Sequence, residues 1–305
     1  MFPTRILLAV DGSPCSEHAA RTATELSRDL DSELRVVLVG ARAMDPGSLA
    51  AVPLLGAEPG PWTRERPEQG ARETLEVHVE KIRAAGGEVS KTHVEFGRPD
   101  AEIVRLAEDI DAGLVVVGSR GFGPLRRAVM GGVSRSVVRH AHCPVLVVRG
   151  GRDTPGPVLV CVDGSKRAMQ AAGVGAEISA ATGAALHVVY VMRAERYRPQ
   201  FGPETWEGWQ ENLERATRDA ISWVEERAEL LQAGTKPAKG HLAFGEPARE
   251  IVRLADEVGA GMVVVGSRGL GGVRRMLLGS VSEAVVEHAP CPVMVVRAPE
   301  RKTGR

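Results

Sequence analysis

Short apolar runs alternate with segments of helical periodicity along the whole chain. Residues 5–10 form an apolar run that ends at Asp11, and residues 16–30 then repeat small and apolar side chains at the spacing of a helix with one buried face. The expected strands are residues 5–10, 34–39, 89–96, 114–117, 145–148, 158–162, 186–191, 240–244, 262–265 and 293–296. The expected helices include residues 16–30, 71–85, 133–140, 213–228 and 247–258.

The order of strand, helix and strand determines how each sheet is wound. A crossover through a helix makes consecutive strands parallel, and such crossovers are right-handed. We therefore predict an α/β fold in which each half of the chain is a doubly wound sheet of five parallel strands. If their spatial order is 3-2-1-4-5, the winding reverses between the first and fourth strands, and ligands bind beyond the carboxyl ends of strands at such a reversal.

The two halves are copies of one another. Three short sequences recur at nearly constant spacing, and a repeat of this length indicates a duplicated domain rather than a solenoid. We place the first domain at residues 1–150 and the second at residues 156–298, joined by a linker rich in glycine and proline. The fifth strand of each is apolar and falls at a sheet edge, so we expect the domains to pair there as a pseudo-twofold dimer. The recurring sequences are VVVGSRG at 115–121 and 263–269, EIVRLA at 102–107 and 250–255, and VDGS at 10–13 and 162–165.

Two segments interrupt the alternation of strands and helices. Residues 40–70 contain five prolines, and residues 193–208 contain Tyr197, Phe201 and Trp206, so we expect a long loop in each copy. The aromatic residues of the second loop either close over a bound ligand or cover a sheet edge or a partner subunit, and the sequence leaves both interpretations open.

Composition narrows the class of protein. The 305 residues, 43% of them hydrophobic, suffice for two full cores. Basic and acidic residues number 39 each, so a net charge of zero gives no general attraction to nucleic acid or to an acidic membrane. No apolar run approaches the roughly 18 residues of a membrane span, and the first residues lack a signal-peptide pattern. We expect a cytoplasmic protein.

The cysteines show neither C-x-x-C spacing nor a histidine at metal-ligand spacing. No metal site made of protein ligands alone is visible in the sequence. We expect small buried apolar side chains in a reducing compartment, rather than disulfides or zinc ligands, at Cys15, Cys143, Cys161 and Cys291.

The candidate chemistry lies in the glycines that follow the fourth strand of each domain. In the second domain, Gly266, Gly269 and the pair Gly279-Ser280 follow a buried strand and precede a helical segment, with the spacing G-x2-G-x9-G-S. Glycines free the backbone amides, and amides and a hydroxyl at a helix N-terminus form a receptacle for phosphate. The alternative is a loop that uses glycine only for tight turns.

The first domain keeps this spacing with one change. Gly118, Gly121 and Gly131 repeat the three glycines, but Gly132 stands where the second domain has Ser280. Because the first domain lacks this hydroxyl, we expect the second domain to bind a phosphate-bearing ligand more tightly.

The pattern G-x2-G-x9-G-[S/T] resembles the ATP-binding signature of the universal stress protein family, and the resemblance covers both domains nearly end to end, except for the long loops. The chain is identified as a tandem member of the ATP-binding type, which implies an adenine nucleotide α-hydrolase-like fold. The resemblance also implies that ribose and phosphates lie on the glycine loop, that the aspartate after the first strand lies near the nucleotide, and that the end of the second strand meets the adenine. A Mg²⁺ ion would accompany ATP, bound largely by phosphate and water.

Carried onto this sequence, the resemblance assigns nucleotide-binding residues in both domains. In the second domain they are Asp163, Val191, Val265, Gly266, Gly269, Gly279, Ser280 and Val281. In the first domain they are Asp11, Val39, Val117, Gly118, Gly121, Gly131 and, without the hydroxyl, Gly132.

A regulator is favoured over an enzyme, because no nucleophile is spaced with a base and no catalytic residue is expected. His140 and His288, near the ends of equivalent helices, are expected to bond the last carbonyls of those helices. We expect an ATP-binding regulator of stress adaptation that forms a homodimer and acts on a regulatory protein partner, with neither nucleic acid nor membrane as a partner. The alternatives are a slow ATP hydrolase or phosphotransferase, and a structural dimerisation module without nucleotide.

Overall fold

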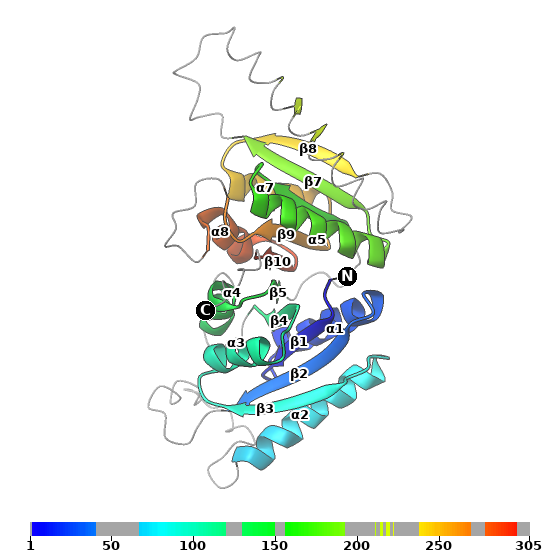
Figure 1. Cartoon of the computed structure of the whole chain (residues 1–305), viewed down its shortest axis with the longest axis vertical. Helices are drawn as coiled ribbons and strands as arrows, with labels where there is room; N and C mark the ends of the chain where they lie inside the picture. Colours follow the sequence, from blue (N-terminus) through cyan, green and yellow to red (C-terminus); the bar gives the residue numbers. More distant parts are fainter. Residues whose placement is uncertain are drawn as a thin grey trace, which may run out of the picture. The chain divides into compact units, whose positions relative to one another are not determined.

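A computed structural model of the chain describes residues 2–40, 67–119, 130–149, 156–192, 238–269 and 278–297, and between 193 and 237 only residues 211, 214–215, 218–219 and 222. The chain divides into two compact units, Pro3–Gly150 and Met1–Phe2 with Gly151–Arg305, which we call the first and second unit (Figure 1). Each unit contains one copy of the sequence repeat.

The first unit is a five-stranded parallel sheet with helices between the strands. Its strands lie in the order β3-β2-β1-β4-β5, so the predicted order 3-2-1-4-5 is confirmed. The elements are β1 (Arg5–Val10), α1 (Pro14–Asp29), β2 (Glu33–Gly40), α2 (Pro67–Ala84), β3 (Lys91–Phe96), α3 (Pro99–Asp109), β4 (Leu114–Gly118), α4 (Gly132–His140) and β5 (Val145–Val148).

The second unit repeats this plan. Its strands lie in the order β8-β7-β6-β9-β10, which is the same order counted from its own first strand, and the strand pairs described within it are parallel. The elements are β6 (Val158–Val162), α5 (Lys166–Thr182), β7 (Leu186–Met192), β8 (Lys239–Phe244), α7 (Pro247–Glu257), β9 (Met262–Gly266), α8 (Ser280–His288) and β10 (Val293–Val296).

The core of each unit lies along its central strands. Ile6, Leu7 and Leu8 of β1 are fully buried, and in β4 and β9 only the terminal glycine is partly exposed. In the first unit α1 packs against β1 and β4, while α3 packs against α4. The reversal of the winding places these two groups of helices on opposite faces, which buries the central strands on both sides. At the edge of the sheet, β3 is partly exposed, as its alternating sequence predicts.

Three predicted boundaries are wrong by more than one residue. Helix α1 begins at Pro14 rather than at residue 16. Helix α2 begins at Pro67, so the predicted loop over 40–70 extends too far. Pro67 and Gly70 suggest a loop by sequence, but proline fits the first position of a helix, where no intrahelical bond needs its amide. Strand β3 begins at Lys91 rather than at residue 89.

Several predictions fall outside the described residues. These are most of the loop over 40–70, the loop over 193–208 with its aromatic residues, and most of the helix over 213–228, of which residues 214–215, 218–219 and 222 are described as helical. Within the described part of the chain, no helix is long and apolar enough to cross a membrane. The pairing of the domains through their fifth strands stays a prediction.

The cysteines correct one expectation. Cys143 and Cys291 are buried, as predicted, but Cys15 and Cys161 are partly exposed. Both lie near the carboxyl edge of the sheet, where the strands end: Cys15 in the first turn of α1 and Cys161 one residue before the end of β6. Burial of the Cys161 sulfur nevertheless raises the pKa of this thiol, so it stays protonated and unreactive near neutral pH.

Candidate functional site

The switch point of each sheet lies where the sequence predicts it. Strand β1 lies between β2 and β4, and β6 lies between β7 and β9. The aspartate segment after β1 or β6 and the glycine segment after β4 or β9 therefore leave the sheet side by side in each unit. This edge holds the candidate site.

The aspartate after the first strand of each unit closes a turn. Oδ1 of Asp163 accepts a hydrogen bond from the Ser165 amide at 2.9 Å, and Oδ1 of Asp11 accepts one from the Ser13 amide at 2.9 Å. Gly164, inside the turn that Asp163 closes, has a φ of 80°, in the left-handed region that favours glycine. Each aspartate therefore has a structural role through one oxygen, in addition to any role in binding.

Gly269 lies against the carboxylate of Asp163. A Cβ atom at this position would stand 2.2 Å from Oδ2 of Asp163, so a larger residue fits only if the carboxylate or the glycine segment moves. Gly279 lies close to the same segment, because a Cβ atom there would stand 3.4 Å from the Cα of Arg268. The fold thus brings together the aspartate, the glycine segment and the start of α8, three features far apart in the sequence.

The glycines that end β4 and β9 also allow close packing against a helix. A Cβ atom on Gly118 would stand 2.9 Å from the carbonyl carbon of Cys15, and one on Gly266 would stand 3.2 Å from that of Arg167. Each strand end therefore touches the first turn of α1 or α5. These two glycines have a packing reason for being glycine, whatever they contribute to a binding motif.

Three hydrogen bonds close the base of the loop between β9 and α8. The Gly279 amide donates to the Ser267 carbonyl at 2.8 Å, and the Ser267 amide donates to the Val296 carbonyl at 2.8 Å. The buried Ser282 donates its hydroxyl to the Gly266 carbonyl at 2.6 Å. The N-terminus of the fourth helix is therefore held at the end of the fourth strand. The first unit repeats these bonds from Gly131 to Ser119, from Ser119 to Val148 and from Ser134 to Gly118.

No side chain of the described residues caps the first turn of α8. Its N-cap is Gly279, and its first residue, Ser280, is exposed. Helices α1, α5 and α7 are instead capped by their own side chains, Ser13, Ser165 and Glu246. The first amides of a helix lack intrahelical partners and the helix dipole favours negative charge there, so the start of α8 is suited to an anion such as phosphate. Helix α4, with a glycine N-cap, has the same character.

The two units differ at the first residue of this helix. Ser280 offers a hydroxyl in the second unit, and Gly132 offers none in the first. Gly132 is exposed, and a Cβ atom added to it would meet no atom of the described residues within 4 Å. The first unit therefore has room for a serine at this position and simply lacks the hydroxyl.

The remaining predicted residues lie around the same edge. Val39 and Val191 are partly exposed, each one residue before the end of β2 or β7. Val117 and Val265 are buried, so they can offer a ligand little beyond their main chain. Val281 is partly exposed in the first turn of α8. Gly121 lies outside the described residues.

His140 and His288 each bond a carbonyl of their own helix, but this carbonyl lies four residues back along the helix and not among its last carbonyls, where the sequence predicts it. Nδ1 of His140 donates to the Ser136 carbonyl at 2.8 Å, and Nδ1 of His288 donates to the Ala284 carbonyl at 3.1 Å. Because a carbonyl can only accept, we assign the proton of each ring to Nδ1 in these bonds.

The structure contains a polar cluster between α3 and α4 that the sequence does not predict. Ser136 donates its hydroxyl to Asp100 at 2.7 Å and Asp100 pairs with Arg98 at 2.9 Å, beside an open cavity of about 380 Å³. Burial alone would raise the pKa of Asp100, but the hydrogen bonds from Ser136 and Arg98 lower it overall. The cluster is not a catalytic triad, because the aspartate bonds the serine and not His140. The only sequence signal is the spacing of Ser136 and His140, which places them on one helix face.

Comparison with known proteins decides the family. The sequence model of the Universal stress protein family matches the chain twice, at residues 3–149 and 156–297. The chain belongs to the universal stress protein family. A universal stress protein of Mycobacterium tuberculosis is 30% identical over 322 residues, covering 97% of this chain and 95% of that protein. A universal stress protein of Mycolicibacterium smegmatis is 30% identical over 302 residues, covering 96% of each.

A solved structure supports the fold of this universal stress protein. The crystal structure of a universal stress protein from Archaeoglobus fulgidus DSM 4304 has a TM-score of 0.65 and 24% identity, covering 97% of this chain and 99% of that one. The double family match confirms the resemblance drawn from the glycine spacing and makes this a tandem universal stress protein.

Proposed function

We propose that this universal stress protein binds ATP, most tightly in its second unit, and works as a nucleotide-responsive regulator of stress adaptation. The observation that carries the proposal is the uncapped N-terminus of α8 at the switch point between β6 and β9. A phosphate there would accept hydrogen bonds from the first-turn amides and from the hydroxyl of Ser280.

The other parts of the nucleotide fit around this phosphate position. The carboxylate of Asp163 can accept a hydrogen bond from a ribose hydroxyl, and Val191 offers a partly exposed apolar contact for adenine. Because Gly269 has no side chain, the backbone of the glycine segment can lie close to the ribose and the phosphate. A Mg²⁺ ion would be held largely by phosphate and water, since no three His, Cys, Asp or Glu side chains of the described ranges gather as a metal cage.

Regulation is favoured over catalysis because the histidine of α8 lies far from the phosphate position. His288 ends the nine-residue helix α8, about 12 Å along the axis from its start. A slow ATP hydrolase or phosphotransferase and a dimerisation module without nucleotide are the alternatives. We further propose a cytoplasmic homodimer of the tandem chain, whose contacts with a regulatory protein partner depend on whether ATP is bound.

Titration calorimetry of the nucleotide-free chain with ATP tests this proposal. We expect binding in wild type and strong loss at the second site in Gly269→Ala, because the added methyl would collide with Asp163. Gly132→Ala is the matched control, since its methyl meets no described atom within 4 Å. Absence of ATP binding to wild type would contradict the proposal and favour the dimerisation module.

Mass spectrometry of the purified chain separates a regulator from a hydrolase. A regulator should keep co-purified or added ATP intact over days, whereas conversion to ADP that disappears in Ser280→Ala would favour hydrolysis.

A further inference from the structure

A pair of histidines joins the two outer strands of the second unit. His187 lies in β7 and His241 lies in β8, which pair in parallel at the edge of the sheet (Figure 1). In this register Lys239 is the direct partner of His187, and His241 lies two residues further along β8. Side chains at such diagonal positions point from the same face of a sheet and can touch.

The two imidazoles meet through their nitrogens. Nε2 of His241 lies 3.1 Å from Nδ1 of His187, with the ring centroids 4.9 Å apart and the ring planes 33° apart. Two nitrogens at this distance share one proton, because one must donate and the other accept. Both side chains are partly exposed, so the shared position is accessible to a small solute.

We propose that His187 and His241 form a two-imidazole chelate for a divalent transition-metal ion of the Zn²⁺, Ni²⁺ or Cu²⁺ class. Bonds of about 2.0–2.1 Å place two nitrogens about 3.3 Å apart in tetrahedral geometry and about 2.9 Å apart in square geometry. The observed 3.1 Å lies between these values. A metal can therefore replace the shared proton with little movement of either ring.

The surroundings keep both rings in the form that binds metals. Burial lowers the pKa of His187 and of His241, and the nearby charge of Lys239 lowers both further. His187 also lowers the pKa of His241, while Glu257 on α7 acts in the opposite direction. Both imidazoles are therefore mainly neutral near pH 7, which is the ligating form. Lys239 is exposed, so its ammonium group can extend into solvent.

The affinity of the site for a metal ion depends on how many protein ligands it supplies. No third His, Cys, Asp or Glu completes a cluster with this pair in the part of the chain that is described, so water would fill the other coordination positions. The ion would be exchangeable, unlike a structural zinc. By linking β7 to β8 it would stabilise the outer edge of the second unit.

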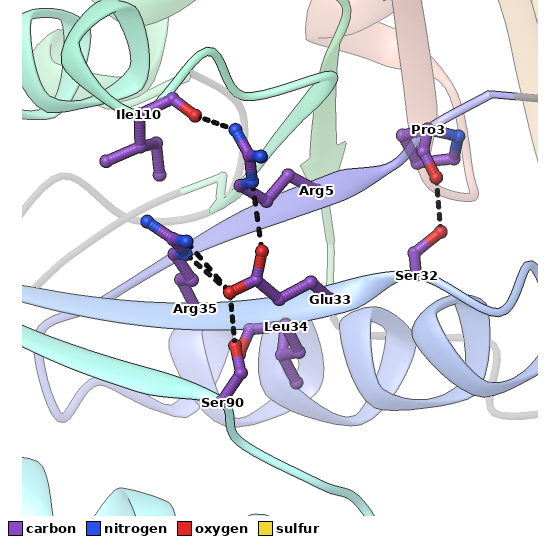
Figure 2. A network of polar contacts seen from close by, with 8 residues as sticks. All are labelled: Pro3, Arg5, Ser32, Glu33, Leu34, Arg35, Ser90 and Ile110. Atoms are coloured by element: carbon purple, nitrogen blue, oxygen red, sulfur yellow. Dashed lines mark hydrogen bonds and ion pairs between the residues drawn. The ribbon is translucent and has the colours of Figure 1, made fainter.

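The first unit has no equivalent chelate. His93 occupies the place of His241, but Arg35 occupies the place of His187 and pairs with Glu33 at 2.8 Å (Figure 2). A guanidinium group is always charged and has no lone pair to offer a metal. The first unit therefore supplies an internal control.

Calorimetric titration of the full chain with Zn²⁺ tests the site, after chelator treatment and dialysis. We expect wild type to bind one ion more than the double variant His187→Gln/His241→Gln, and each single variant to weaken that ion by about tenfold or more. His93→Gln, the matched control, should leave its affinity unchanged. Equal stoichiometry and affinity in wild type and the double variant would overturn the proposal, even if other histidines bind zinc.

A second measurement needs no variant. In NMR titrations of wild type with Ni²⁺, the ring signals of His187 and His241 should broaden before those of the other histidines. Lowering the pH from 7 to 5 should release the ion, because protonated imidazoles cannot ligate. Broadening of other histidines while these two remain sharp would overturn the proposal.

Discussion

The amino-terminal ends of the first two strands carry charged side chains in the first unit and mostly uncharged ones in the second. In the first unit Glu33 accepts hydrogen bonds from Arg5 at 2.9 Å and from Ser90 at 3.1 Å, and pairs with Arg35 (Figure 2). In the second unit the corresponding residues are Pro157, Ala185, His187 and Ala238. The first unit therefore has a network of charged side chains where the second unit has uncharged residues and one imidazole, although the strand order of the two units is the same.

This contrast separates what the fold requires from what each unit is free to change. The turn aspartates, the strand-end glycines and the buried serines Ser134 and Ser282 recur in both units with nearly identical bonds. The differences fall on side chains at edges and helix starts, such as Gly132 against Ser280. The two copies have kept the residues that hold the fold together. They differ at positions where a side chain faces solvent or a possible ligand rather than the core of its own unit.

The largest expected difference concerns the glycines that end the fourth strands. Gly118→Ala should destabilise the first unit by about 2–3 kcal/mol, because a methyl 2.9 Å from the Cys15 backbone forces a shift. Gly266→Ala should cost the second unit about 1 kcal/mol, because its contact with Arg167 is looser at 3.2 Å. Hydrogen exchange of buried amides in β1 and β6 measures each unit separately. Equal losses would show that these close contacts relax freely.

The next effect concerns affinity at the two starts of the fourth helix. Ser280→Gly should weaken ATP binding at the second site by about tenfold, and Gly132→Ser should strengthen the first by a similar factor, from one hydrogen bond to a charged group worth about 1.5 kcal/mol. This is the lower end of the usual range, because water can replace a lost hydroxyl. Calorimetry on the single variants and the exchanged pair measures both. No gain from Gly132→Ser would mean that this hydroxyl does not distinguish the sites.

A smaller effect should follow from removing charge at the turn. Asp163→Asn keeps an oxygen for the Ser165 amide but loses an acceptor for ribose, so ATP affinity at the second site should fall about threefold to tenfold with little change in Tm. Asp11→Asn is the control and should affect only the first site. An unchanged affinity together with a lower Tm would leave the turn as the only role of Asp163.

The smallest effect concerns acid stability. Burial alone would raise the pKa of Glu33, but the hydrogen bonds from Arg35, Ser90 and Arg5 lower it overall, so the folded state favours the carboxylate. Its contribution is present above the unfolded value near 4.5 and is lost as pH falls below it. Glu33→Gln should reduce the stability of the first unit by up to about 1 kcal/mol at pH 7, and by less at pH 3. Hydrogen exchange at both values checks this, and a loss that grows toward pH 3 would have the wrong sign.

Much of the frame could be predicted from the sequence. The apolar runs predict every described strand, because a strand depends on local periodicity, and the strand–helix–strand connectivity predicts that the strands are parallel. The spatial order 3-2-1-4-5 is what the family resemblance implies, since connectivity alone allows other orders. The meeting of Asp163 with the glycine segment follows from that order alone. The start of α2 could not be predicted, because Pro67 suits a loop and a first helical turn equally.

Side-chain contacts between different helices and strands could not be predicted from the sequence. Ser136 and Asp100 meet only because α3 packs against α4, and His187 meets His241 across 54 residues through the register of β7 and β8. No local pattern encodes a strand register or a contact between helices, so neither the Ser136–Asp100 bond nor the His187–His241 pair has a sequence signature. The hydroxyl of Ser280 is the opposite case, because its position in the motif is enough to place it at the start of α8.

Because Asp11 closes the turn that starts α1, selection for folding alone would retain this aspartate in a copy that had lost its ligand. The same holds for Gly118, which its contact with Cys15 keeps small. Motif searches anchored on these two residues would therefore overcount working sites among tandem duplicates. The residue at the first position of the fourth helix, which carries no such folding constraint at Gly132, is the position at which decay of one copy would first become visible.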